Sequence, residues 1–177
     1  MTGTHTIEIH DDVFPLSVRL NTFNSALNSS FSLLDWTCTS VPERHSHNLS
    51  FFSPWSTEYV ESLSILASIR NSPASHILEN YELTKSILNL TTPSDVYYTH
   101  THPEEKVLLY YVNLEWKEGW HGETQFYSDN LRDIKYTSPY TPGRLILFDG
   151  NIPHTMRPQS IIAPKFRFSL SMFLNRK

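Results

Sequence analysis

The sequence predicts an α+β fold that is mainly β, in which a jelly-roll-like barrel is supported by N-terminal helices. Two observations lead to this prediction. From about residue 96 onward, short apolar or alternating segments are separated by turns rich in Gly, Pro, Asn and Ser. The segment 56–89 before them instead carries helix start signals and apolar residues at helical spacing. Several strands that follow a helical region favour a barrel packed against helices.

The N-terminal half is expected to begin with β-structure. Residues 5–10 alternate loosely between polar and apolar side chains and predict an edge strand. Residues 14–55, rich in Asn, Ser and Phe, predict short strands joined by loops.

Two helices are predicted between residues 56 and 89. The first covers 56–70, and the apolar face assigned to it consists of Tyr59, Leu63, Leu66 and Ala67. The second begins with Ser72 as the N-cap and Pro73 at the first helical position. It is expected to reach about residue 89, and the side chains that it would bury are Ile77, Tyr81 and Leu88.

The C-terminal half predicts four strands, which cover 107–113, 122–127, 144–149 and 166–174. The last strand alternates strictly. One face carries apolar side chains, namely Phe166, Phe168, Leu170, Met172 and Leu174. The opposite face carries polar ones, namely Arg167, Ser169 and Ser171.

Composition narrows the class of protein. A chain of 177 residues fits a single domain, and a net charge of −4 without a basic stripe argues against binding to nucleic acid or to an anionic membrane. The only cysteine, Cys38, excludes internal disulfides and thiolate zinc clusters. The polar N-terminus has no signal-peptide core, and no apolar run approaches the ~20 residues of a membrane span. We therefore expect a cytoplasmic protein.

Histidines and a carboxylate offer a metal site. On an extended segment, side chains at i and i+2 point the same way, and both His102 with Glu104 and His100 with His102 have that spacing. His154, far along the chain, would supply the third ligand. Two histidines and one carboxylate are the ligand set of non-haem Fe(II) oxygenases, with open positions for co-substrate and dioxygen. Spacing leaves both pairs open, so the set is His154 with either His102 and Glu104 or His100 and His102.

The polar face of the last predicted strand has two interpretations. It is either a solvated face or a carboxylate anchor, in which the Arg167 guanidinium pairs bidentately with a carboxylate and Ser169 adds a hydroxyl donor. A buried arginine requires such a partner.

A series of motifs then brings in a known family. The series contains YYVNLEW at 110–116, GET at 122–124, PGRLILFD at 142–149, IPH at 152–154 and RFS at 167–169. In order and spacing it resembles the Fe(II)/2-oxoglutarate dioxygenases of the prolyl-4-hydroxylase-like group. The resemblance covers residues 98 to 174 and implies a double-stranded β-helix, the jelly-roll or cupin-like barrel.

The resemblance also implies roles for individual residues. His154 would be the distal iron ligand, Arg167 with Ser169 would bind the C5 carboxylate of 2-oxoglutarate, and Tyr111 would donate a hydrogen bond to that carboxylate. The residues that would line the substrate pocket are Trp116, Trp120, Tyr140 and Thr124. Trp120 and Tyr140 lie in loops that we expect to form a lid.

The chain departs from the family pattern at two places. His121 stands where the family has the first glycine of a GGE-T motif. No HxD motif precedes YYVN, and the loop between the proposed ligands and that strand is short. His102-Pro103-Glu104 is the best substitute, and His100 with His102 would give a three-histidine site.

The function that follows is an Fe(II)- and 2-oxoglutarate-dependent dioxygenase. It would use dioxygen to hydroxylate an unidentified small-molecule or peptide substrate, peptidyl proline among the candidates, and release succinate and CO2, with ascorbate as an accessory reductant. The whole chain, 1–177, would be one domain: 1–95 gives the supporting strands and helices, and 96–177 the metal- and co-substrate-binding core. We expect a monomer or a homodimer.

Three other functions use the same residues. One is a cupin-like metal-binding protein, and another is a non-enzymatic jelly-roll binding module. The third is a zinc hydrolase, for which Glu105 is the spare carboxylate that could act as a general base.

Overall fold

Two antiparallel β-sheets build the molecule. The computed structural model describes residues 6–35, 49–93, 95 and 98–177. Strands of the larger sheet follow the order β1-β8-β5-β10-β4-β3-β2, and those of the smaller sheet the order β7-β6-β9. The larger sheet consists of β1 (Ile7–His10), β2 (Ser32–Asp35), β3 (Leu49–Trp55), β4 (Tyr81–Thr91), β5 (Lys106–Tyr111), β8 (Leu145–Asp149) and β10 (Arg167–Arg176). The smaller sheet consists of β6 (Thr124–Tyr127), β7 (Ile134–Ser138) and β9 (His154–Met156).

The central strands of the larger sheet divide the core into two layers, because successive side chains point to opposite faces. In β5, Leu108 and Tyr110 belong to the apolar cluster on the helix side. Val107, Leu109 and Tyr111 belong to the cluster between the two sheets, where they meet Phe126 of the smaller sheet. Strand β10 follows the same rule, and its polar residues Arg167 and Ser169 are fully buried.

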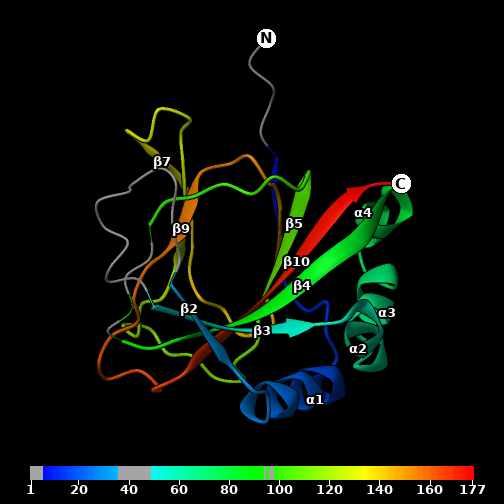
Figure 1. Cartoon of the computed structure of the whole chain (residues 1–177), viewed down its shortest axis with the longest axis horizontal. Coiled ribbons are helices and arrows are strands. Elements are labelled where there is room, and N and C mark those ends of the chain that lie inside the picture. Colours follow the sequence, from blue (N-terminus) through cyan, green and yellow to red (C-terminus); the bar gives the residue numbers. More distant parts are fainter. Residues whose placement is uncertain (1–5, 36–48, 94, 96–97) are drawn as a thin grey trace.

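Four helices cover the outer face of the larger sheet. They are α1 (Leu16–Leu27), α2 (Thr57–Ser62), α3 (Ile65–Arg70) and α4 (Ser75–Asn80). Figure 1 shows α2, α3 and α4 on one side of β4 and β10, while β7 and β9 lie on the other side. No helix in the described ranges is long and apolar enough to cross a membrane.

Helix α1 corrects the prediction of strands and loops over 14–55. It begins after Pro15, which has no side-chain hydrogen bond to the first turn, so the usual start signal is absent. Its buried positions are Val18, Thr22 and Ala26, four residues apart. Because Thr22 and Ala26 are not strongly hydrophobic, the buried face of the helix differs little in hydrophobicity from its exposed face. A search for apolar residues at helical spacing therefore misses this helix.

The helix predicted over 56–70 is instead two short helices. Ser56 caps α2 as expected, with its hydroxyl accepting the Tyr59 N–H at 3.1 Å. Ser64, in a left-handed conformation with φ of 61°, then separates α2 from α3. The break turns the chain, so that Tyr59 is 41% exposed and Val60 is buried in its place.

The helix predicted to reach residue 89 ends at Asn80, and 81–91 forms strand β4. This segment pairs with β10 along its whole length and with β3 on its other side. The strand pairings with β10 and β3 stabilise an extended conformation here, although Ile77, Tyr81 and Leu88 have helical spacing. Such spacing predicts a helix only weakly where strands from elsewhere in the chain can pair with the segment.

The strand predictions for the C-terminal half are confirmed at β5, β6, β8 and β10, with boundaries shifted by at most two residues. Residues 7–10 form the predicted edge strand, and β1 pairs with β8 at the border of the larger sheet. Strands β7 and β9 were not predicted because they are short and have no apolar run. Cys38 lies outside the described residues.

Candidate metal centre and carboxylate anchor

Three histidines from two separate segments come together at one end of the barrel. One ligand nitrogen from each of His100, His102 and His154 lies within 4.8 Å of the others. The ring centroids are 4.9 Å apart for His100 and His102, 4.5 Å for His100 and His154, and 5.0 Å for His102 and His154. His154 opens strand β9, which Figure 1 places in the smaller sheet. The three imidazoles could therefore hold one metal ion.

Backbone hydrogen bonds fix the two segments against each other. The N–H groups of His100 and His154 each donate to the other's carbonyl oxygen at 3.0 Å. The His102 N–H donates to the Gly150 carbonyl at 2.7 Å, and the Gly150 N–H donates to that of Glu105 at 3.0 Å. This ladder sets the register that brings the three rings together.

Gly150 is required where the two segments approach most closely. A Cβ atom at this position would lie 1.9 Å from the Glu104 carbonyl oxygen and 3.2 Å from that of His102. No side chain fits there, since contacts below 3.0 Å force the backbone to shift. Gly150 therefore allows the two backbones to approach each other closely.

The three imidazoles are held neutral, which is the form that binds metal. Burial lowers the pKa of His100 and lowers the pKa of His154 well below its usual range. Burial also lowers the pKa of His102 to about 3, and the neighbouring His100 and Lys85 add to that effect.

Two of the three rings have a defined tautomer. Nδ1 lies 3.0 Å from the Tyr98 carbonyl oxygen in His100 and 2.9 Å from that of Ile152 in His154. A carbonyl oxygen accepts only, so Nδ1 carries the proton in each neutral ring and the lone pair resides on Nε2. Histidine ligands of metals commonly donate their other ring N–H to a backbone carbonyl in this way.

Glu104, which we favoured as a ligand, is not part of this group, and His100 takes its place beside His102 and His154. The reason is local: the backbone bends over 103–105, so the same-face rule for i and i+2 ends at His102. The Glu104 carboxylate accepts from Lys85 Nζ at 3.1 Å. Its other oxygen, Oε2, is buried and has no hydrogen-bond partner among the described residues.

Arg167 is a buried cation that has no anionic partner among the described residues. Its side chain is fully buried in the barrel, yet Nε and Nη2 have no hydrogen-bond partner in the described part of the chain. Its guanidinium lies over the rings of Tyr140 and Tyr111, with the central carbon 4.4 and 5.5 Å from the ring centroids. The solvated interpretation of this strand face is therefore wrong at Arg167.

Ser169 and Tyr111 lie beside this cation. The two residues are direct partners across the β10–β5 ladder, and both are fully buried. The Tyr111 hydroxyl donates to Thr124 Oγ1 at 2.7 Å. Burial raises the pKa of Tyr111 above its usual value, so this phenol stays protonated and able to donate.

The aromatic residues assigned to a substrate pocket form a continuous row. Tyr111 stacks on Tyr140 at 4.4 Å, Tyr140 contacts Trp116 at 4.6 Å, and Trp116 contacts Trp120 at 5.5 Å between ring centroids. Tyr140 is only 4% exposed, and its hydroxyl lies 2.8 Å from Asn113 Oδ1. Tyr140 therefore packs beneath Arg167 and is not part of an exposed lid, whereas Trp120 lies at the outer end of the row.

His121, which stands where the family pattern has a glycine, adopts a left-handed backbone conformation. It has a positive φ of 56°, a conformation that glycine adopts freely and histidine tolerates. Gly122, with φ of 83°, follows it, and a Cβ there would lie 3.1 Å from Arg167 Nε. Gly122 thus leaves the room in which the guanidinium is packed.

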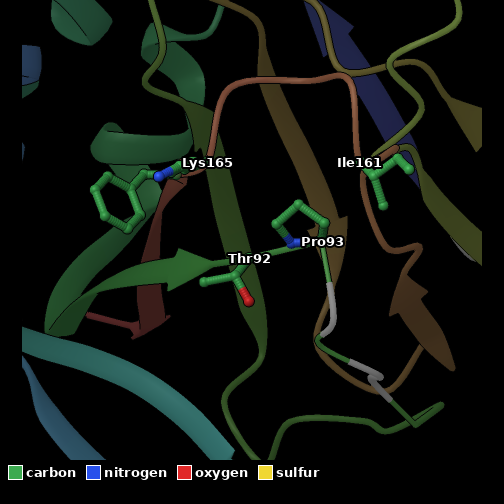
Figure 2. Close-up of a pocket in the computed structure, with 5 residues that line it drawn as sticks. Thr92, Pro93, Ile161 and Lys165 are labelled. Carbon is green, nitrogen blue, oxygen red and sulfur yellow. The ribbon is translucent and has the colours of Figure 1, made fainter.

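A hollow in the surface lies outside this site. It is an open groove of about 400 Å³, and Figure 2 shows Thr92 and Pro93 between Lys165 and Ile161. Its lining is largely apolar and consists of Thr92, Pro93, Ile161, Lys165 and Phe166. Neither the three histidines nor Arg167 lines it.

Comparisons with known proteins give a result only at the level of structure. No family model matches the sequence, and no curated protein matches it. A solved prolyl hydroxylase from Trichoplax adhaerens, in complex with a hypoxia inducible factor oxygen degradation domain peptide fragment, is similar with a TM-score of 0.71 and 18% identity. That match covers 98% of this chain and 84% of the other.

Two further structures are similar. The non-heme alpha ketoglutarate dependent epimerase SnoN from nogalamycin biosynthesis matches with a TM-score of 0.68 and 10% identity, over 97% of this chain and 79% of SnoN. A 2OG-Fe(II) oxygenase family oxidoreductase from Burkholderia pseudomallei matches with a TM-score of 0.63 and 12% identity, over 97% and 86% of the two chains.

The chain has the fold of the 2OG-Fe(II) oxygenases. The predicted double-stranded β-helix is confirmed, and the resemblance to the prolyl-4-hydroxylase-like group holds for the fold as a whole. It extends into the N-terminal half, where the sequence has no motif of that group.

Two side chains near the site were not predicted from the sequence. Met156 lies two residues after His154 on the same strand, and its sulfur contacts Arg167 Nη1 at 3.1 Å. The i+2 spacing from a proposed ligand was the available signal. Lys85, which pairs with Glu104, comes from strand β4 and had no signal because that segment was predicted as helix.

Replacement of Gly150 tests the close approach of the two segments. We expect Gly150→Ala to destabilise the protein by about 1–3 kcal/mol, the usual cost of overpacking, and to weaken metal binding because the His100–His102 segment is displaced. Denaturant unfolding and a metal titration measure the two effects. Gly119→Ala is the control: its new Cβ meets nothing within 4 Å, so it carries the strain of a positive φ of 80° without a clash, and its metal affinity should stay unchanged. An equally small effect at both glycines would contradict the argument.

Replacement of single ligands decides between His100 and Glu104. We expect His100→Ala to weaken Co(II) or Zn(II) binding by more than about 100-fold, beyond what loss of an outer partner costs. Glu104→Gln should leave the Kd within about 3-fold, because Glu104 lies outside the group of three ligand nitrogens. His76→Ala, a surface histidine on α4, is the matched control. Strong loss of metal in Glu104→Gln would instead make Glu104 a ligand.

Proposed function

We propose that the protein is an Fe(II)- and 2-oxoglutarate-dependent dioxygenase that hydroxylates an organic substrate. One observation carries this proposal: a buried, unpaired Arg167 lies in the same barrel as a three-histidine cluster. A metal-binding cluster alone suits many functions. A buried cation without an anion in addition calls for an anionic ligand, and a carboxylate matches the fork of the guanidinium.

The residues present fit an iron ion. We assign His100, His102 and His154 as its ligands, since imidazole suits Fe(II) and the three rings are neutral. The proposed set contains no carboxylate, in contrast to the two-histidine, one-carboxylate arrangement. The protein ligands then leave the full 2+ charge of the metal in the site, which favours binding of an anionic co-substrate.

The residues also fit 2-oxoglutarate. Its C5 carboxylate would pair with Arg167, with the Ser169 hydroxyl and Tyr111 as further donors, while its 2-oxo acid end would reach the metal. A bidentate pairing with this carboxylate would give Nε and Nη2 of Arg167 the hydrogen-bond partners that they lack among the described residues. Each unmade hydrogen bond of a buried polar group costs on the order of 1–3 kcal/mol, more for charged groups. Two such donors make a strong preference for a carboxylate.

The bound iron and 2-oxoglutarate would supply oxidation of a substrate C–H bond by dioxygen, with succinate and CO2 as co-products. The chain itself would hold the parts in place and exclude water. The backbone ladder between His100 and His154 fixes the metal end, and strand β10 fixes the anchor end. Apolar side chains between the two sheets, Phe126 and Phe148 among them, surround His154 at 5.9 and 4.7 Å between ring centroids.

A zinc hydrolase is the second candidate function, because three histidines are also a ligand set of catalytic zinc. That reaction needs a general base near the metal. Glu105 is exposed and lies 3.8 Å from Arg176, and Glu104 pairs with Lys85. Neither carboxylate joins the histidine group, and a hydrolase would leave the unpaired Arg167 unexplained.

The remaining assignments follow from the same proposal. Dioxygen and an unidentified small-molecule or peptide substrate would be the partners, with peptidyl proline among the candidates and ascorbate as the accessory reductant. We infer a cytoplasmic, single-domain protein that acts as a monomer or homodimer and binds neither nucleic acid nor membranes. The cupin-like and non-enzymatic readings predict no requirement for 2-oxoglutarate.

Removal of the guanidinium tests the anchor. We expect Arg167→Ala to weaken 2-oxoglutarate binding by at least about 30-fold, equivalent to the ~2 kcal/mol lower limit for loss of one partner of a buried charge pair. Metal affinity should stay unchanged, because Arg167 is not among the three ligands. Calorimetric titrations of metal and of 2-oxoglutarate measure both. Arg70→Ala, which removes an exposed arginine, is the control. An unchanged 2-oxoglutarate Kd in Arg167→Ala contradicts the proposal.

A further inference from the structure

The side chain of Met156 lies on the donors that we assign to the co-substrate. Arg167 Nη1 points to the Met156 sulfur at 3.1 Å, and the Ser169 hydroxyl points to the same atom at 3.7 Å. The sequence predicts that these two donors bind one carboxylate together. In the structure the Met156 sulfur is the atom on which they converge.

We propose that Met156 is a displaceable cap, which occupies the place of a carboxylate oxygen and leaves when 2-oxoglutarate binds. This inference rests on the proposed function and adds a control on access to its co-substrate site. The cap makes the affinity for 2-oxoglutarate lower than Arg167 and Ser169 alone would give.

Strand β9 places Met156 between the two ends of the site. His154 and Met156 are two residues apart on this strand, so their side chains point to the same face of the small sheet. Met156 also pairs with Thr124 in the β6–β9 ladder, and Thr124 accepts the hydroxyl of Tyr111. The same strand thus presents a proposed metal ligand at one end and the cap at the other.

The chemistry of the contact favours displacement. A thioether sulfur is a weak hydrogen-bond acceptor, and it gives a guanidinium no countercharge. With the cap in place, Nε and Nη2 of Arg167 still have no partner. A carboxylate oxygen forms charge-assisted hydrogen bonds that are about twice as strong as neutral ones. The three rotatable bonds of methionine allow the sulfur to swing away without movement of the strand.

Only molecules in which the cap is open can bind 2-oxoglutarate. The apparent Kd is therefore the Kd of the open form divided by the fraction of molecules that are open. If the cap is closed in about nine molecules in ten, its removal lowers the apparent Kd for a dicarboxylate about 10-fold. A stronger acceptor of similar length at position 156 should do the opposite. The side-chain amide of glutamine has that length and an oxygen that both donors can reach.

The test uses two ligands on the full-length protein. Calorimetry measures the Kd of 2-oxoglutarate for the metal-loaded protein without oxygen, and the Kd of glutarate, which has no 2-oxo group and reports the anchor alone. We expect Met156→Ala to tighten both about 10-fold and Met156→Gln to weaken both by a similar factor.

Met172→Ala is the matched control. It makes the same deletion in β10, but on the helix side of the sheet, where Met172 is fully buried. Its Kd values should equal those of the unchanged protein, and thermal unfolding shows that each variant is folded.

The outcomes separate the cap from the function on which it rests. Unchanged or weaker binding in Met156→Ala, or unchanged binding in Met156→Gln, overturns the cap while the anchor stands. Failure of 2-oxoglutarate to bind either the unchanged protein or Met156→Ala overturns the proposed function itself. Tighter binding in Met156→Ala together with weaker binding in Met156→Gln supports the cap.

Discussion

The site depends on the buried guanidinium of Arg167, which has no countercharge among the described residues. Strand β10 must alternate, so once its apolar face packs against the helices, Arg167 and Ser169 point into the barrel. The rings of Tyr111 and Tyr140 lie under the cation, and Gly122 leaves space beside it. These contacts hold the guanidinium in position but supply no acceptor for Nε and Nη2. We propose that an anion binds at this place.

The metal end depends on a different constraint, the close approach of two backbones at Gly150. The ladder from His100 to His154 and from His102 to Gly150 sets the three rings before any metal binds. Burial keeps the imidazoles neutral, so binding requires no loss of protons near neutral pH. The three neutral histidines and the buried guanidinium are both in place in the structure, and we propose that one anionic co-substrate bridges them.

Much of this site could be predicted from the sequence, since strand alternation and i, i+2 spacing are local rules. They identified His102, Arg167 and Ser169, while His154 was proposed as the distant third ligand and Tyr111 followed only from the family resemblance. They did not decide between His100 and Glu104, because the decision depends on a bend at 103–105 and on Lys85 from a distant strand. The contact of Met156 with Arg167 was also missed, although the i+2 spacing of Met156 from His154 was an available signal.

The fold shows the same division between local and distant effects. Strands β5, β8 and β10 carry strong apolar or alternating patterns and were predicted. Segment 81–91 has an ambiguous pattern and becomes a strand because β3 and β10 flank it. Helix α1 is held by a stripe of Val18, Thr22 and Ala26 that covers the sheet, a role that only packing reveals.

The most direct measurement is an anaerobic titration of 2-oxoglutarate into the Fe(II)-loaded protein, followed by visible absorption. Chelation of an open iron site by a 2-oxo acid gives a weak metal-to-ligand charge-transfer band. Our account predicts that this band appears and saturates at one 2-oxoglutarate per iron. Absence of the band, with iron shown to be bound, would contradict the claim that the three histidines and Arg167 form one site for iron and 2-oxoglutarate.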